Sequence, residues 1–194
     1  RKKISGGADA HLFTIKNDKE GNPVRAKSRI VALGNLEKRI WSRGDRYAPV
    51  LSSTASRLLL SMAVSDGRKL KQGDCKNAFC NGILSEDEIC IVKPPLGCPR
   101  STGSYWKLNR TLYGLSRSAK HWFKKISGHL INDMGFTAMK QDECVLKCTP
   151  FPGQPPIFLG LYVDDMIYYS KSDKVEQWFE QELKSHVNVD FMGQ

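Results

Sequence analysis

Two adjacent aspartates, Asp164 and Asp165, lie between apolar stretches and constrain this chain more than any other sequence feature. The apolar run 157–163 precedes them and the β-prone residues 166–169 follow, a pattern that predicts two strands joined by a short turn. Each carboxylate at such a tip must be hydrated, paired or bound to a metal, and like charges at this spacing repel. The pattern therefore predicts either an ordinary polar turn, in which Asp is a favoured residue, or a site for a cation.

A third carboxylate that could complete a cation site is Asp74, which ends the extended segment KLKQGD 90 residues before Asp164. Hard oxygen ligands suit Mg²⁺, and two such ions roughly 3.5 to 4 Å apart can activate a hydroxyl and stabilise a leaving oxygen in phosphoryl transfer. That chemistry needs no histidine base. Only the tertiary structure could bring Asp74 to the later pair.

Hydrophobic periodicity predicts both strands and helices in the rest of the chain. Alternation over 11–16, turn formers at 17–23 and a return over 24–33 predict an N-terminal hairpin. Its return strand would place Arg25, Lys27 and Arg29 on one face, for which a solvated polar face is the ordinary interpretation. Short strands are expected at 70–75 and 89–92, with a turn or helical loop at 77–84 between them.

Three helices are expected from capping residues and apolar spacing. The first begins near Ser52 and runs to about Val64, with a buried stripe formed by Leu58, Leu59, Met62 and Ala63. The second is expected after Gly114, because apolar residues recur there at steps of three and four: Leu115, Ala119, Trp122, Ile126 and Leu130. The last begins with a capping box of Asp173 and Glu176 and carries Val175, Trp178, Phe179 and Leu183.

Size and charge limit the classes of protein that this sequence could represent. A chain of 194 residues that is 40% apolar can bury one core or two small subdomains. A net charge of +10 favours a partner rich in phosphates, although anionic membranes and acidic proteins attract the same surface. No apolar run is long enough to cross a bilayer, so we expect a soluble, intracellular protein that does not bind membranes.

The cysteines do not form a zinc-binding pattern. None of the six belongs to a CxxC pair, and only four histidines are scattered through the chain. We expect reduced thiols that are mostly packed in the interior, with Cys144 and Cys148 in one short element.

Five ordered segments of the sequence resemble copia-type (Pseudoviridae) long-terminal-repeat retrotransposon reverse transcriptases. LYVDDMIYYS (161–170) is similar to the YxDD box, and QGDCKNAFCNGIL (72–84) is similar to the segment that carries the first catalytic aspartate. RAKSRIVALG (25–34), RYAPVLSSTASRLLLSMA (46–63) and LNRTLYGLSRSAKHWF (108–123) resemble further blocks in family order. The resemblance implies an α+β fold with reverse-transcriptase-like fingers and palm, in which helices back an antiparallel palm sheet.

The resemblance also assigns roles to individual residues. It implies that Asp74, Asp164 and Asp165 are catalytic and bind two Mg²⁺ or Mn²⁺ ions, with help from the Cys75 carbonyl. Phe79 would exclude a ribose 2′-hydroxyl, although an ordinary core aromatic is an equally simple interpretation. Further substrate-binding residues implied by the resemblance are Lys27, Arg29, Asn77, Ala78, Tyr113, Gly114 and Tyr162. The expected partners are a template-primer of RNA or DNA, a deoxynucleoside triphosphate and other segments of a parent polyprotein.

Several positions depart from the family pattern. The block usually written KQAPRAW reads SRSAKHW here, from Ser116 to Trp122. We expect a single reverse transcriptase fragment in which residues 1–50 form a fingers hairpin and 51–194 form mostly palm, without thumb, RNase H or integrase. The main hypothesis is a polymerase core located in cytoplasmic virus-like particles or the nucleus. The alternative is an inactive retrotransposon remnant that still folds and binds nucleic acid; a two-metal nuclease would not explain the KNAF and LYGL segments.

Overall fold

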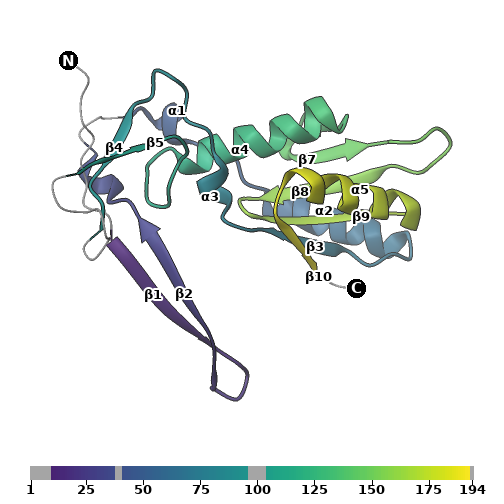
Figure 1. Cartoon of the computed structure of the whole chain (residues 1–194). Coiled ribbons are helices and arrows are strands. Elements are labelled where there is room, and N and C mark those ends of the chain that lie inside the picture. Colours follow the sequence, from purple (N-terminus) through teal and green to yellow (C-terminus); the bar gives the residue numbers. More distant parts are fainter. Residues whose placement is uncertain (1–9, 38–40, 96–103, 193–194) are drawn as a thin grey trace. The chain divides into compact units, whose positions relative to one another are not determined.

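The computed structural model describes residues 10–37, 41–95 and 104–192 and combines helices with antiparallel sheets (Figure 1). The chain forms two compact units. The first contains residues 1–47 and 79–121, and the second contains residues 48–78 and 122–194. Each unit is built from segments that are separated in the sequence, because residues 48–78 of the second unit interrupt the first.

The first unit contains a two-stranded ribbon and several short elements. Strands β1 (Ala10–Asn17) and β2 (Pro23–Val31) pair in antiparallel register, and Gly21 takes a positive φ of 90° in the turn between them. The short elements are η1 (Gly34–Leu36), α1 (Arg43–Arg46), β4 (Cys90–Val92), β5 (Trp106–Leu108) and α3 (Ala78–Asn81), of which Ala78 belongs to the second unit. The hairpin predicted at 11–33 is confirmed.

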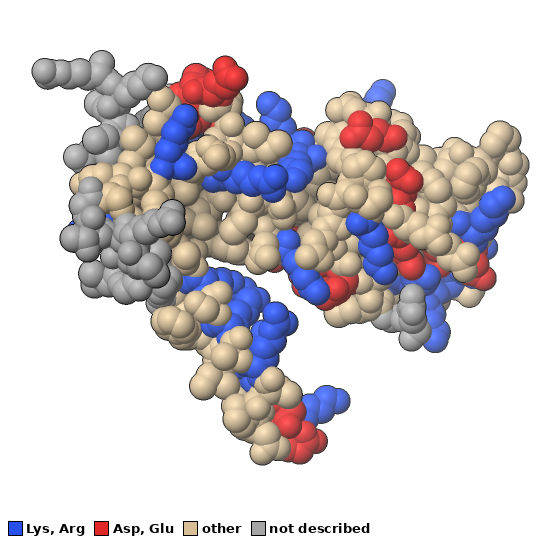
Figure 2. Space-filling model, viewed as in Figure 1, with Lys and Arg blue, Asp and Glu red and all other residues tan. Residues whose placement is uncertain are grey.

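The ribbon has two chemically different faces. Opposed residues of an antiparallel pair share a face, and the register sets Arg29, Lys27 and Arg25 opposite Leu12, Thr14 and Lys16. We call this side, with Lys16, Arg25, Lys27 and Arg29, the cationic face. The other side carries exposed apolar residues: Phe13, Ile15, Val24 and Ala26. Lysine and arginine atoms gather along one side of the ribbon in Figure 2.

The second unit is built on a six-stranded sheet with the order β10-β3-β9-β8-β7-β6. All of its pairings are antiparallel. The strands are β3 (Lys71–Cys75), β6 (Thr137–Met139), β7 (Asp142–Cys148), β8 (Ile157–Tyr162), β9 (Asp165–Ser170) and β10 (Val189–Met192). Strands β8 and β9 are the predicted pair around the two aspartates, and they lie in the middle of the sheet, where their apolar side chains are buried on both faces.

Helices cover both faces of this sheet. Helix α2 (Ser53–Ser65) packs on one face, where Gly160 of β8 lets Leu59 approach the strand closely. Helix α5 (Asp173–His186) packs on the opposite face (Figure 1), where Phe179 contacts Tyr168 of β9. Helix α4 (Ser118–Gly128) continues into the π turn η2 (His129–Asp133) and buries Trp122, Ile126 and Leu130. No helix of the described residues is both long and apolar enough to span a bilayer.

Three details of the helix predictions are wrong. The second helix was expected directly after Gly114, but α4 begins at Ser118, so Leu115 lies outside it, and Leu115 and Ala119 are only partly buried. Leu58 was expected in the buried stripe of α2, but it is 60% exposed, and only Leu59 and Ala63 of that set are fully buried. The predicted capping box of Asp173 and Glu176 does not form, because the N-cap is Ser172 and Glu176 is buried against the sheet. Tertiary ion pairs thus use the carboxylates that the sequence pattern assigned to local capping.

The cysteine prediction is confirmed for the described residues. Cys75, Cys80, Cys90, Cys144 and Cys148 are free thiols, and all except Cys80 are buried. Cys144 and Cys148 both belong to β7. Cys98 lies outside the described residues.

Candidate active site

Two of the predicted carboxylates come from directly opposite positions on neighbouring strands. In the antiparallel pairing of β3 with β9, Asp74 is the register partner of Asp165. Side chains at such positions leave the same face of the sheet, with their Cβ atoms roughly 4.5 to 5.5 Å apart. The sheet register therefore brings together two residues that are far apart in the sequence.

Asp164 joins them through the turn that connects β8 to β9. Val163 and Asp164 form this turn, which the pairing of Tyr162 with Asp165 closes. The backbone N–H of Cys75 donates to the Asp164 carbonyl oxygen at 2.8 Å. The residue that follows Asp74 is thus tied to the backbone of Asp164, and all three aspartates meet at one end of the β3–β9 pair.

The carboxylate groups themselves are not gathered around one point. The Gln72 amide Nε2 donates to Asp165 Oδ1 at 3.3 Å. Within residues 10–37, 41–95 and 104–192, no group of three or more His, Cys, Asp or Glu side chains has metal-binding geometry. The structure supplies a shared backbone frame for the three aspartates.

The electrostatics of this end of the sheet reflect the density of negative charge. Burial, and secondarily the charges of Asp74, Asp164 and Asp165, raise the pKa of the Cys75 thiol to about 12. Cys75 is therefore a protonated, packed side chain at neutral pH. A protonated thiol does not bind Mg²⁺ well, so the part of Cys75 that could serve a metal ion is its backbone carbonyl, which the resemblance implies as a ligand.

Asp190 is a further carboxylate beside the aspartates that sequence reasoning missed. It lies on β10, where it is the register partner of Asp74. Asp190, Asp74 and Asp165 thus occupy matching positions on three adjacent strands and share one sheet face. Lys76 Nζ lies 2.5 Å from Asp190 Oδ2 and offsets one of these charges. No local motif marks Asp190, so only the register of β10 could have identified it.

The other predicted residues of the second unit lie within a few positions of the aspartates in the sequence. Asn77 takes a positive φ of 53°, a conformation that Asn tolerates better than most residues, so the chain turns sharply after β3. Ala78 is buried, whereas Tyr162 is 53% exposed. These residues are brought near the aspartates by their position in the chain.

The predicted residues of the first unit form a separate group. The Arg29 guanidinium carbon lies 5.5 Å from the centroid of the Tyr113 ring. The Phe79 ring meets the same ring edge-on, with 5.3 Å between centroids. Lys27 is near Arg29 on the cationic face, opposite Thr14. The structure thus brings Arg29 and Phe79 together around the Tyr113 ring.

Gly114 is held where no other residue fits without displacement. Its φ is +88°, and a Cβ atom there would lie 2.0 Å from the Ala32 carbonyl oxygen. The Ala32 N–H also donates to the Tyr113 carbonyl oxygen at 2.7 Å. The loop that carries Tyr113 is therefore packed directly on the end of β2.

The departures from the family pattern take part in a polar network within the first unit. Ser116 Oγ and its N–H donate to Glu37 Oε2 at 2.5 and 3.1 Å. Arg117 forms an ion pair with Glu88, and His121 Nε2 lies 3.0 Å from Glu88 Oε2. The altered side chains therefore have acidic partners, which are compatible with a folded and ordered first unit.

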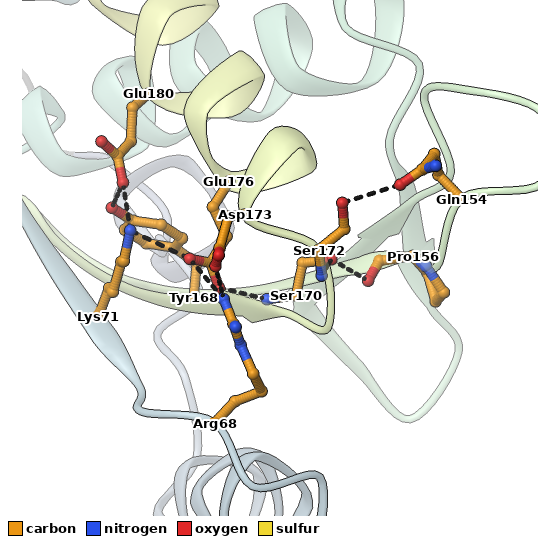
Figure 3. Close-up of polar contacts among 10 residues, drawn as sticks. All are labelled: Arg68, Lys71, Gln154, Pro156, Tyr168, Ser170, Ser172, Asp173, Glu176 and Glu180. Atoms are coloured by element: carbon orange, nitrogen blue, oxygen red, sulfur yellow. Dashed lines mark hydrogen bonds and ion pairs between the residues drawn. The ribbon is translucent and has the colours of Figure 1, made fainter.

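An ion-pair network around the buried Glu176 joins α5 to β3 and β9 (Figure 3). Lys71 Nζ lies 3.0 Å from both Glu176 Oε2 and Glu180 Oε1, and Arg68 lies 3.2 Å from Glu176. The Tyr168 hydroxyl donates to Glu180 at 2.7 Å. Lys71 and Tyr168 are register partners, and each is three residues from one of the opposed aspartates. The network therefore fixes α5 to the strand pair that sets their register.

Comparison with known proteins identifies the family of the chain. A family model described as "Reverse transcriptase (RNA-dependent DNA polymerase)" matches residues 3–194. The chain belongs to this reverse transcriptase family.

Curated relatives are polyproteins of copia-type transposons. The chain is 32% identical over 183 residues to the retrovirus-related Pol polyprotein from transposon TNT 1-94 of Nicotiana tabacum, covering 94% of the chain and 14% of that protein. It is 29% identical over 157 residues to that from transposon RE1 of Arabidopsis thaliana, covering 80% and 10%. The Ty1-H Gag-Pol polyprotein of Saccharomyces cerevisiae is 28% identical over 165 residues, covering 82% and 8%. The chain thus spans only about a tenth of the length of these relatives.

Proposed function

We propose that this chain is the polymerase core of a retrotransposon reverse transcriptase, which adds deoxynucleotides to a primer 3′ end. The observation that carries the proposal is the register of β3 and β9, which opposes Asp74 and Asp165 while Cys75 binds the Asp164 backbone. In this proposal the first unit corresponds to fingers and the second to palm.

The donor set at the end of the β3–β9 pair fits two divalent ions. Carboxylate and carbonyl oxygens are the ligands that Mg²⁺ and Mn²⁺ prefer, and no histidine or thiolate competes among the proposed ligands. Asp74, Asp164, Asp165 and the Cys75 carbonyl would hold the ions. When bound, the ions would lower the pKa of the primer 3′ hydroxyl and stabilise the leaving oxygen.

The chain's own residues would bind and orient the substrates. The cationic face would contact the phosphates of the template-primer or the triphosphate without reading sequence. Phe79 would stand beside the sugar and disfavour a 2′-hydroxyl, supported by its edge-on contact with Tyr113. The backbone of Asn77 and Ala78 would lie near the triphosphate, with Gly114 supporting the templating pair and Tyr162 beside the aspartates.

A primer-extension assay on the chain tests the proposal. Extension of a DNA primer on an RNA template should require Mg²⁺ or Mn²⁺, and Asp74→Asn or Asp165→Asn should reduce it at least about a hundredfold, because each removes a ligand of the site. The matched control is Glu143→Gln, which removes an exposed carboxylate on β7. Equal extension by the Asp74→Asn variant and the parent chain would refute the proposal.

The second candidate is an inactive remnant that folds and binds nucleic acid. The departures at Ser116, Arg117 and His121 favour it, because the family's residues are replaced while the acidic partners keep the unit folded. This candidate predicts salt-dependent binding of primer-template with no extension by the chain, even when Mn²⁺ replaces Mg²⁺. In either case we propose that the parent polyprotein acts in cytoplasmic virus-like particles or the nucleus.

A further inference from the structure

Val163 adopts a backbone conformation that is unfavourable for its side chain. Its φ is +56°, in the left-handed region. For a β-branched residue this region is an outlier, because the branched Cβ crowds the backbone. Val163 shares the β8–β9 turn with Asp164, so a relaxation of Val163 would rotate the peptide that leads directly into Asp164.

Trp122 of α4 holds that conformation from outside the hairpin. Its indole Nε1–H donates to the Val163 carbonyl oxygen at 2.7 Å. The indole is 1% exposed and belongs to the apolar stripe with Ile126 and Leu130, so the ring has a fixed position. A buried indole N–H needs an acceptor, and here the acceptor is the strained residue of the turn.

The two peptide units on either side of Asp164 are thus held by different parts of the second unit. The Val163 carbonyl is bound by Trp122, and the Asp164 carbonyl is bound by the N–H of Cys75 at 2.8 Å. Strained backbone persists only where the surrounding structure restrains it, and such residues concentrate at functional sites. With both bonds in place, the direction in which the Asp164 side chain leaves the turn is fixed.

We propose that Trp122 is a positioning residue for Asp164, and that its indole N–H keeps Val163 left-handed so that the Asp164 carboxylate is aimed at the metal site. The inference rests on the proposed function for the role of Asp164. It predicts that loss of one N–H group weakens metal binding through the Val163 backbone, without removing any ligand.

The test uses Trp122→Phe, which retains a buried ring and removes the hydrogen-bond donor. Binding of Mn²⁺ alone to the full chain is measured by electron paramagnetic resonance, and we expect Kd to rise about three- to tenfold, the effect of one hydrogen bond. The ¹³C shifts of Val163 should lose the signature of a positive φ. The matched control is Trp178→Phe, which removes an indole N–H from the half-buried Trp178 of α5.

A double-mutant cycle with Val163→Gly separates positioning from general stability. Glycine adopts a positive φ without strain. The factor by which Trp122→Phe raises Kd should therefore fall toward one when Val163→Gly is also present. An equal rise in both backgrounds, an equal rise for Trp178→Phe, or no rise at all would overturn the inference. If Asp164→Asn left the Mn²⁺ affinity of the parent chain unchanged, the proposed metal site would fail, and the inference with it.

Discussion

Glu176 provides a quantitative test of how the second unit holds strands β3 and β9. Its side chain is 1% exposed and receives the Ser170 N–H at 2.9 Å, besides its ion pairs with Arg68 and Lys71 (Figure 3). Glu176→Gln keeps the shape and the acceptor for Ser170 but removes the charge. Removal of one partner of a buried ion pair costs roughly 3 to 5 kcal/mol.

The expected cost here is smaller because each cation keeps a second carboxylate. Lys71 retains Glu180 and Arg68 retains Asp173, and both cations are about a quarter exposed. We therefore expect a loss of about 2 kcal/mol in the free energy of unfolding. With a urea dependence of roughly 2 kcal/mol per M, the midpoint should fall by about 1 M.

Urea unfolding followed by tryptophan fluorescence measures this shift. The matched control is Glu182→Gln, the same change on the same helix at a partly exposed position, which should move the midpoint by less than about 0.3 M. Equal midpoints for the two variants would refute the reasoning that buried charge on α5 stabilises the β3–β9 pair.

Four further measurements test other parts of the structure. Gly160→Ala should destabilise the second unit by about 1 to 3 kcal/mol in urea unfolding, because the added methyl would lie within 2.7 Å of a leucine side chain. Burial, followed by two neighbouring carboxylates, raises the pKa of Cys144 from 9.0 to about 12. The unfolded chain then releases a proton above pH 9 that the folded chain keeps, so the free energy of unfolding should fall as the pH rises from 9 toward 12. It should fall less in the Cys144→Ala variant. The Arg117 guanidinium carbon lies 4.1 Å from the centroid of the Trp41 ring. Arg117→Gln should therefore speed amide hydrogen exchange around Trp41, which mass spectrometry measures. Glutamine at all four positions of the cationic face should reduce, by about 3 to 4, the slope of log K against log salt concentration for primer-template binding. An unchanged slope would exclude this face as a contact for the phosphates.

Local pattern was sufficient for the elements whose signals were strong. The apolar run before Asp164 predicted β8, and the helix expected after Gly114 buries Trp122 and Ile126 as its spacing required. Local pattern failed where tertiary contacts compete for the same groups. Glu176 resembled a capping residue, but its carboxylate pairs with two cations, Lys71 of β3 and Arg68 of the preceding loop. These two ion pairs stabilise the carboxylate more than a hydrogen bond at the end of the helix would. Strands β6 and β10 are short, so the sequence contains too few alternating residues to mark them.

The residue types of the candidate site, two aspartates at a strand turn and a third after an extended segment, are determined by the sequence and are recognisable from it. The pairing of Asp74 with Asp165 and with Asp190 is not, because strand register depends on contacts between segments far apart in the chain. The same holds for the bond from Trp122 to the Val163 carbonyl. A side chain can restrain a distant backbone only after the sheet and helices have packed, so the geometry of the aspartates was decided by the tertiary structure.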